Sequence, residues 1–250
     1  MILSVFEQFE IVRIIPIHLF GNLDISITNS TLFMLIAFTF IVVLYNGNIK
    51  NGKLVPSRWQ SIIELIYIGI SGIVKENLGV NNNSKLPLLF TLFMFIGTMN
   101  LFGLVPYTFT PTSHIVITFG LSLSIFIACN IIGLAAHKWN FFSMFLPAGS
   151  PIVLAPFLIV IEFISHFAKA ISLGVRLASN IIAGHLLFVI LAGFTWQMLI
   201  SGSASLVVLS LFPFIIIFAI TGLELAVSII QAYVFALLTA MYLKDSIYLH

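Results

Sequence analysis

The chain has 250 residues, of which 60% are hydrophobic and only 7% carry a charge. Soluble domains carry about 25% charged residues. This chain therefore cannot cover a water-facing surface, and its apolar side chains must face lipid. The composition predicts a polytopic membrane protein and excludes a soluble enzyme or a disordered tail. A net charge of +2 gives no sign of nucleic-acid binding.

The N-terminal region is the least regular part of the chain. Residues 1–24 mix charged residues with proline, and indicate a surface tail that processing could shorten, or a short interfacial helix. Residues 25–45 follow as an apolar run long enough to cross a bilayer as a helix. We expect this span to end at the turn-forming sequence Asn46-Gly47-Asn48.

Charged residues are concentrated between Lys50 and Lys85, a segment that holds seven of them. Within it, residues 56–77 carry apolar side chains at helical spacing, which predicts an amphipathic helix. Such a helix lies along the membrane surface or packs on another subunit, and the pattern allows both.

Two further spans form a predicted hairpin over residues 86–136, with a link from Pro106 to His114 that includes two prolines. After the second span, Lys138 lies on the same side of the membrane as the charged segment and Lys244, whereas Arg13 lies alone on the other side. The positive-inside rule then places the C-terminus in the inside compartment and the N-terminus outside.

The region 151–245 is apolar but interrupted by polar and ionisable side chains, which are costly inside a membrane and therefore indicate function. They are Glu162, His166, Lys169, Arg176, Asn180, His185, Glu224 and Gln231. A continuous helix over 151–200 would be about 75 Å long, against a hydrocarbon core of about 30 Å. The helix must therefore break or run strongly tilted. Pro156 and Pro213 mark kinks or first turns.

An antiparallel hairpin that closes near residue 204 would bring these polar residues into layers. Residues that face each other then have numbers that sum to about 408. This places Glu162 opposite Asp245, Arg176 opposite Gln231 and His185 opposite Glu224. Along the first helix, the Glu162 layer lies about 21 Å from Arg176, and the His185 layer about 13 Å to its other side. Two proton-accepting layers around a fixed cation are what two half-channels separated by a barrier require.

The residue types suit proton transfer. Arginine does not deprotonate at any working pH, whereas histidine and desolvated carboxylates exchange protons near neutrality. A buried guanidinium at Arg176, about 21 Å from Glu162, implies a carboxylate partner on another subunit. Small residues would allow another helix to approach closely, and they are Ala178, Ser179, Ala183, Gly184, Gly222 and Ala226.

Two long runs in this region, Ser172–Leu187 and Glu224–Leu237, resemble subunit a of the F-type ATP synthase. The ending Tyr242–His250 resembles the fungal mitochondrial form, as do three shorter segments, Ser57-Arg58-Trp59, Phe90–Phe95 and Phe145–Gly149. The resemblance covers essentially the whole chain and is most specific in its C-terminal half.

This resemblance implies a stator subunit beside a ring of proton-carrying c subunits, with two long helices steeply inclined in the membrane. Arg176 matches the family's essential arginine, which faces the ring carboxylate. Asn180, His185, Glu224 and Gln231 match positions that line the proton path on the intermembrane-space side, and Glu162 and Asp245 match its matrix-side exit.

The implied location is the mitochondrial inner membrane, with the N-terminus in the intermembrane space and the C-terminus in the matrix. The implied partners are the c-ring, other stator and membrane-sector subunits including the peripheral stalk, membrane lipids, protons, and a second ATP synthase in a dimer. No cofactor or metal is expected. The sequence has no phosphate-binding loop, so ATP chemistry is expected on other subunits.

Two rival functions remain open. A secondary transporter or proton antiporter would carry inverted repeats, and none is convincing here. A scaffold subunit would tolerate apolar replacements in the polar layers. Two single residues are also open: His166 extends the exit path or is solvated, and His114 could touch the outer entrance.

Overall fold

The computed structural model describes residues 9–19, 23–24, 26–49, 55–105, 108–145 and 154–248. Five of the described helices are long and apolar enough to cross a membrane. The predicted all-α polytopic class is therefore confirmed. Parts of the predicted elements lie outside the described residues, namely residue 25 of the first span, Lys50 and Lys53 of the charged segment, Pro106 of the link, 146–149 and 249–250 of the segments that carry the resemblance, and 151–153 of the long hairpin.

The described part of the N-terminal tail is extended chain that folds back on itself, and not the alternative of a short interfacial helix. Two antiparallel strand pairs form there, β1 (Arg13–Ile15) with β4 (Ile27–Thr28), and β2 (His18–Leu19) with β3 (Leu23–Asp24). The side-chain amide of Asn29 donates to the Glu10 carbonyl at 3.0 Å. This bond ties the tail to the start of the first helix.

Helix α1 (Asn29–Ile49) begins later than predicted and runs on through the expected stop at Asn46-Gly47-Asn48. Its start is fixed by reciprocal bonds, because the Thr28 amide donates to Thr31 Oγ1 at 2.9 Å and the Thr31 amide donates to Thr28 Oγ1 at 3.4 Å. One glycine in a helix interior costs only about 1 kcal/mol. The turn-forming sequence is therefore too weak to end the helix.

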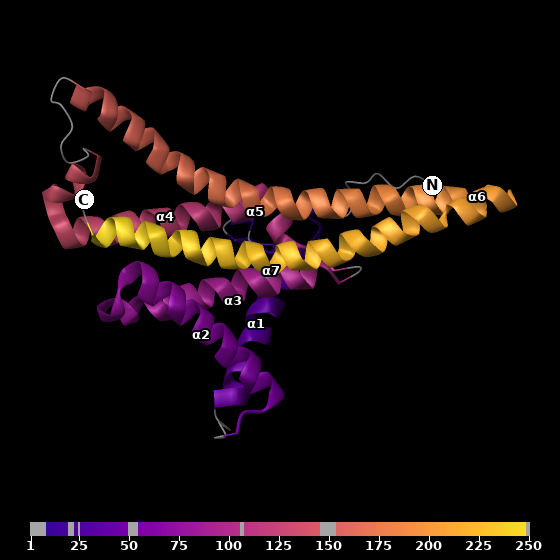
Figure 1. Cartoon of the computed structure of the whole chain (residues 1–250), viewed down its shortest axis with the longest axis horizontal. Coiled ribbons are helices and arrows are strands. Elements are labelled where there is room, and N and C mark those ends of the chain that lie inside the picture. Colours follow the sequence, from indigo (N-terminus) through magenta and orange to yellow (C-terminus); the bar gives the residue numbers. More distant parts are fainter. Residues whose placement is uncertain are drawn as a thin grey trace.

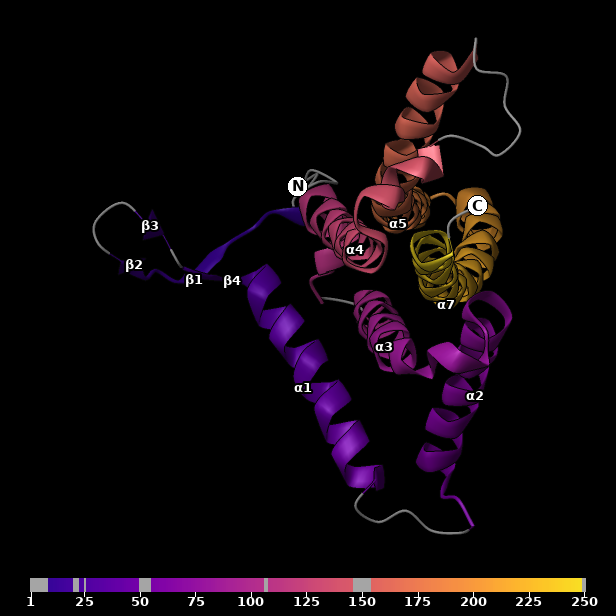
Figure 2. The same cartoon turned by 90° about the vertical axis from the view of Figure 1, so that its left-hand side faces the viewer.

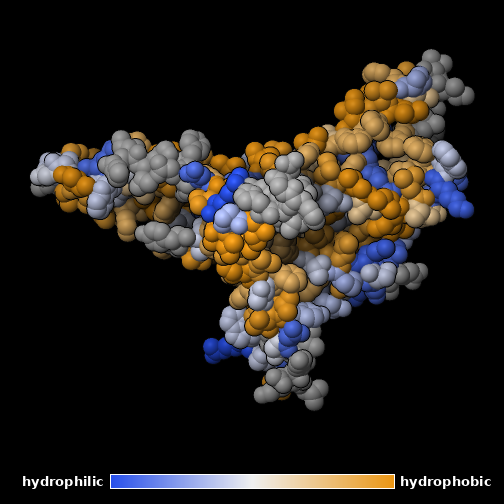
Figure 3. All heavy atoms as spheres, turned by 180° about the vertical axis from the view of Figure 1, so that it is seen from behind, coloured by the Kyte–Doolittle hydropathy of each residue, from blue (hydrophilic) through white to orange (hydrophobic). Residues whose placement is uncertain are grey.

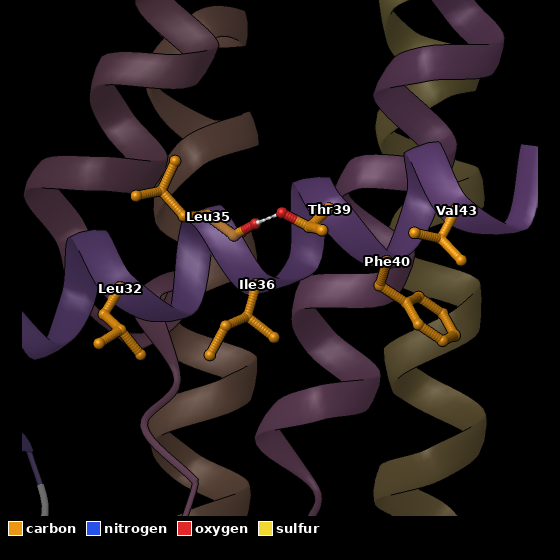
Figure 4. A pocket seen from close by; sticks show the side chains of 6 residues that line it. All are labelled: Leu32, Leu35, Ile36, Thr39, Phe40 and Val43. Atoms are coloured by element: carbon orange, nitrogen blue, oxygen red, sulfur yellow. Dashed lines mark hydrogen bonds between the residues drawn. The ribbon is translucent and has the colours of Figure 1, made fainter. Parts of the chain in front are cut away.

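One exposed face of α1 is almost wholly apolar and carries a shallow hollow. It is lined by Leu32, Leu35, Ile36, Thr39, Phe40 and Val43 (Figure 4). The Thr39 hydroxyl donates to the Leu35 carbonyl at 2.8 Å. This bond satisfies the Thr39 hydroxyl, the polar side-chain group among these six residues. The face therefore suits contact with lipid tails or with another membrane helix.

Helix α2 (Arg58–Leu78) is the predicted amphipathic helix. The Ser57 hydroxyl caps its start by accepting from the Gln60 amide at 3.4 Å, and Gly79 ends it with φ +78°. One apolar face of its C-terminal half is buried (Ile70, Ile73, Val74 and Leu78), whereas Trp59 near its start is exposed. The five candidate spans do not include α2. Its place on the membrane surface or on another subunit stays a prediction.

The next two spans are α3 (Leu86–Gly103) and α4 (Ile115–His137). A short 3-10 helix, η2 (Val80–Lys85), leads into α3, and η3 (Pro111–Ser113) lies in the link between the spans. A further 3-10 segment, η4 (Lys138–Phe145), follows α4. The chain then reaches the long hairpin.

The long hairpin consists of α5 (Ala155–Ile200), the short α6 (Ala204–Leu209) and α7 (Leu211–Ile247). Helix α5 does not break; it is continuous over 46 residues and curves gently along the molecule (Figure 1). A helix of this length spans about 70 Å, so it must be strongly inclined to stay within a bilayer. Gly202, with φ +72°, makes the turn, and Pro156 and Pro213 lie in the first turns of α5 and α7.

Helix α7 is the centre of the fold and packs against α2, α3, α4 and α5 (Figure 2). Its alanines at 232, 236 and 240 are fully buried. A Cβ added to Gly97 on α3 would lie 3.6 Å from the Ala232 Cβ, so the two backbones lie close together. Lipid tails are as apolar as these side chains, and close packing rather than the hydrophobic effect therefore holds membrane helices together.

The face of the molecule seen in Figure 3 is mainly apolar, with a few separate hydrophilic patches. One end of the bundle brings together the end of α7, the start of η2 and the end of α4. There the Tyr248 hydroxyl donates to the Leu78 carbonyl and accepts from the Asn82 amide, both at 3.1 Å, and His137 Nε2 lies 2.8 Å from the Ile247 carbonyl.

Candidate functional site

One polar contact inside the long hairpin joins a histidine of α5 to a carboxyl group of α7. Nε2 of His185 lies 3.9 Å from Oε1 of Glu224, and the two side chains are 19% and 9% exposed. This contact agrees with the facing pairs expected for a hairpin closed near residue 204. A carboxyl group and an imidazole at this separation can exchange a proton directly after a small movement or through one water.

Glu224 reaches His185 because α5 carries a glycine at the point of contact. A Cβ added to Gly184 would lie 2.6 Å from Glu224 Oε1 and 2.8 Å from its carboxyl carbon. Among the described residues, Glu224 Oε1 has no hydrogen-bond donor. The carboxyl group is therefore enclosed between α5 and α7, with the His185 imidazole within ion-pair distance.

The same histidine has a neighbour outside the hairpin. Oγ1 of Thr110, in the link between α3 and α4, lies 3.3 Å from His185 Nε2. The ring of Phe9 meets the imidazole edge-on with centroids 6.2 Å apart. The N-terminal tail and the link thus both lie beside His185, in the half of α5 that is nearer the turn of the hairpin.

A second polar contact lies one turn toward the middle of the hairpin. Asn180 Nδ2 donates to Gln231 Oε1 at 3.1 Å. Equal-rise reflection places Arg176 opposite Gln231, and this pairing is wrong by about one turn. Reflection assumes helices with parallel axes, whereas α5 is curved (Figure 1) and packed helices cross at an angle.

Buried amides and hydroxyls continue this contact toward α3. Asn100, which is fully buried, donates from Nδ2 to the Ser228 carbonyl at 3.4 Å. Among the described residues, Asn100 Oδ1, Ser228 Oγ and Gln231 Nε2 have no partner. Buried polar atoms are almost always bonded to protein or water, so this part of the bundle has the chemistry of a hydrated interior.

Arg176 lies on the exposed face of α5, so the prediction of a buried guanidinium is wrong for the chain by itself. Its Nη2 donates to Ser172 Oγ at 3.4 Å, and among the described residues no carboxylate lies within ion-pair distance. Ser179 and Ala183 are exposed at helical spacing from it. The exposed face that carries Arg176 therefore includes a row of small residues, which leaves room for another helix.

The third predicted pair, Glu162 and Asp245, is not joined by a hydrogen bond or an ion pair in the described chain. Burial has the largest effect on His166, which lies between them along the hairpin, and Lys169, Asp245 and Glu162 also act on it electrostatically. His166 is only 5% exposed, and its Nε2 lies 3.0 Å from Asn130 Oδ1. The alternative of a solvated His166 is therefore wrong. We call these residues (His166, Glu162, Asp245, Lys169 and Asn130) the His166 cluster.

His114 marks the end of the α3–α4 link, just before the span of α4. Its ring stacks on Phe109 with centroids 5.2 Å apart, and its Nε2 is buried without a partner among the described residues. Burial lowers the pKa of His114, because the low-polarity surroundings disfavour the imidazolium form.

Four polar residues near these clusters were not singled out from the sequence. Asn100 and Asn130 could have been, because each is an amide inside an apolar span. Thr110 and Ser228 gave no usable signal, since small hydroxyl residues are common in loops and in membrane helices.

Comparison with known proteins agrees with this architecture. The family model for the ATP synthase A chain matches residues 28–244. The chain is 47% identical to ATP synthase subunit a of Marchantia polymorpha, over 99% of both chains. It is 48% identical to subunit a of Metridium senile, over 98% of both chains. It is also 45% identical to subunit a of the fungus Mycosarcoma maydis, over 99% of this chain and 98% of the relative. With five candidate membrane spans and full-length similarity to these proteins, the chain belongs to the ATP synthase subunit a family.

Proposed function

We propose that this protein is the proton-translocating stator subunit of a rotary ATP synthase membrane sector. The observation that carries the proposal is the placing of Arg176. It is an exposed cation with no carboxylate within ion-pair distance among the described residues, and it lies along α5 between the His185–Glu224 pair and the His166 cluster. A fixed cation between two proton-exchanging sites suits two offset half-channels.

The proton path begins at the His185–Glu224 pair. A proton from the outside passes to Glu224, moves along the Asn180–Gln231 contact with water in the buried polar region, and reaches a carboxylate of the c-ring. The neutral carboxyl group can then leave Arg176 and enter the lipid, because its desolvation cost is far lower than that of the ionised form.

The exit lies at the other end of α5. When ring rotation brings the protonated carboxyl group to the far side of Arg176, it releases its proton toward the His166 cluster. Arg176 holds the carboxylate ionised between these two events, and it cannot relay a proton itself because its pKa is too high. The barrier between the half-channels is thus the guanidinium.

The proposed setting follows the resemblance noted in the sequence. The c-ring packs on the small-residue face around Arg176, where Ser172, Ser179 and Ala183 leave room for a neighbouring helix. The protein lies in the mitochondrial inner membrane with its N-terminus in the intermembrane space and its C-terminus in the matrix. Other stator subunits, the peripheral stalk, lipids and a second ATP synthase in a dimer complete the partners, and ATP chemistry belongs to other subunits.

The test is proton flux through liposomes that contain the purified membrane sector. Replacing Glu224 by Gln removes the titrating group and should lower passive flux at least about tenfold, which corresponds to about 1.4 kcal/mol in the barrier. Arg176→Ala should abolish proton-coupled ATP synthesis in the whole enzyme. Glu76→Gln, an exposed carboxylate on α2, is the matched control and should leave both measurements unchanged.

The alternatives give different results. A scaffold subunit predicts wild-type flux in Glu224→Gln and wild-type ATP synthesis in Arg176→Ala. An antiporter predicts proton flux that requires a counter-transported solute. Either result would overturn the proposal.

A further inference from the structure

Two oxygen atoms from different elements face one nitrogen of His185. Thr110 Oγ1 lies 3.3 Å from Nε2, and Glu224 Oε1 lies 3.9 Å from the same atom. The threonine is the nearer of the two and is itself 6% exposed. The imidazole thus contacts the α3–α4 link more closely than it contacts the carboxyl group of α7.

Thr110 is fixed where it stands. A Cβ added to Gly103 would lie 2.8 Å from Thr110 Oγ1, so the threonine side chain fills the space that this glycine leaves at the end of α3. The backbone is held as well, because the Thr110 carbonyl accepts from the Ser113 hydroxyl at 2.7 Å and from its amide at 3.1 Å. The Thr110 side chain is thus packed against the end of α3, with its hydroxyl within hydrogen-bond distance of the imidazole.

A hydroxyl suits this position better than another group would. It can donate to a bare Nε2 or accept from a protonated one, so the contact survives when the histidine changes its protonation state or tautomer. We propose that Thr110 is a positioning residue for proton transfer, whose hydroxyl holds Nε2 of His185 toward Glu224 in both states. This inference rests on the proposed function, because it assumes that protons pass through the His185–Glu224 pair.

Few other charged or titratable side chains lie close enough to the His185 ring to bind it in place of Thr110. Glu224, from α7, is the charged side chain within ion-pair distance of the ring among the described residues. From the N-terminal tail the ring meets Phe9, which does not titrate. His114 in the same link as Thr110 stacks on Phe109 instead.

The experiment compares Thr110→Val, which keeps the shape but removes the hydroxyl, with Thr110→Ser, which keeps the hydroxyl. Proton flux through liposomes with the whole membrane sector is measured as the pH on the outer, N-terminal side is varied. Thr110→Val should lower the flux about threefold to tenfold, the size expected for one lost buried hydrogen bond, and should shift the pH profile of that side. Thr110→Ser should restore both.

The control is Thr239→Val. Thr239 is a fully buried threonine whose hydroxyl donates to the Phe235 carbonyl within α7, and this change should move neither the flux nor the profile. If Thr110→Val does not assemble, Thr110→Ala carries the test, because it removes the hydroxyl without adding bulk beside Gly103.

Two results would overturn the inference. One is a wild-type flux and pH profile in Thr110→Val or Thr110→Ala, and the other is a loss in Thr110→Ser as large as that in Thr110→Val. Glu224→Gln in the same preparation separates this inference from the proposed function. If Glu224→Gln abolishes flux while the threonine variants behave as wild type, only the role of Thr110 fails. If Glu224→Gln conducts normally, the proposed function fails.

Discussion

At the scale of single residues, the contact between α5 and α7 depends on the absence of one side chain. Gly184 lies directly beneath the Glu224 carboxyl group, and a Cβ there would lie 2.6 Å from Oε1. Because Glu224 is only 8% exposed, its carboxyl group has little space into which it could retreat. The glycine therefore sets the distance between Glu224 and His185.

Replacing Gly184 by alanine should displace the Glu224 carboxyl group and lower proton flux several-fold without preventing assembly. The matched control is Gly193→Ala on the same helix, where an added Cβ would meet no described atom within 4 Å. Both changes improve helix propensity by about 1 kcal/mol, so a difference between them reports the contact. Equal flux in the two variants would contradict the prediction, and Glu224→Asp in the Gly184→Ala background should recover part of the loss.

At the scale of elements, the end of α7 is held by its neighbours. The Tyr248 hydroxyl bridges the Leu78 carbonyl and the Asn82 amide, and His137 contacts the Ile247 carbonyl. These bonds join α7 to α2, η2 and α4 just beyond Asp245, in the last turn of the helix. The position of Asp245 in the His166 cluster therefore depends on contacts made by residues outside that cluster.

Tyr248→Phe should loosen this end of α7. Two lost hydrogen bonds at a partly exposed site are worth about 1 kcal/mol, which lowers the unfolding temperature of a chain of this size by about 2–4 °C. Thermal unfolding of the purified chain in detergent measures the shift. Tyr233→Phe, an exposed tyrosine on the same helix, is the control, and an equal shift in both variants would argue against the tether.

Elements were predictable to different degrees. Long apolar runs predicted the spans, because backbone groups in lipid must bond within a helix and the length of the run sets the length of the helix. The run through Asn46-Gly47-Asn48 and the unbroken α5 were not predictable, since local breakers are weak against a continuing hydrogen-bond ladder. The paired strands of the tail are too short, at two or three residues each, to give a recognisable alternating pattern in the sequence.

At the scale of the whole molecule, the fold separates two ends. The Thr110 link and Phe9 lie beside His185 at one end, and the end of α7 meets η2 and α4 at the other. Lys85 in η2 and Lys244 in α7 belong to elements that meet at this second end, and Lys138 directly follows α4. Basic residues thus lie at one end of the fold, as the positive-inside rule expects for the inside end. The orientation in the membrane stays a prediction.

Sidedness can be measured with single cysteines after Cys129, which is buried, is replaced by alanine. Glu10→Cys and Glu76→Cys remove equal charge at exposed positions on either side of the α1 span. In mitochondria stripped of their outer membrane, an impermeant thiol reagent should label position 10 directly and position 76 only after the inner membrane is opened. The reverse pattern would contradict the orientation.

The sequence by itself determined the membrane class, the approximate spans and the pairing of His185 with Glu224, because composition, run length and rise per residue are local quantities. Only the tertiary structure decided that Gln231 meets Asn180, that Arg176 is exposed, that His166 is buried beside Asn130, and that Thr110 holds His185. Spacing along a helix gives the height of a residue. It does not give the rotation of the helix about its axis or its neighbours, which packing between distant elements decides.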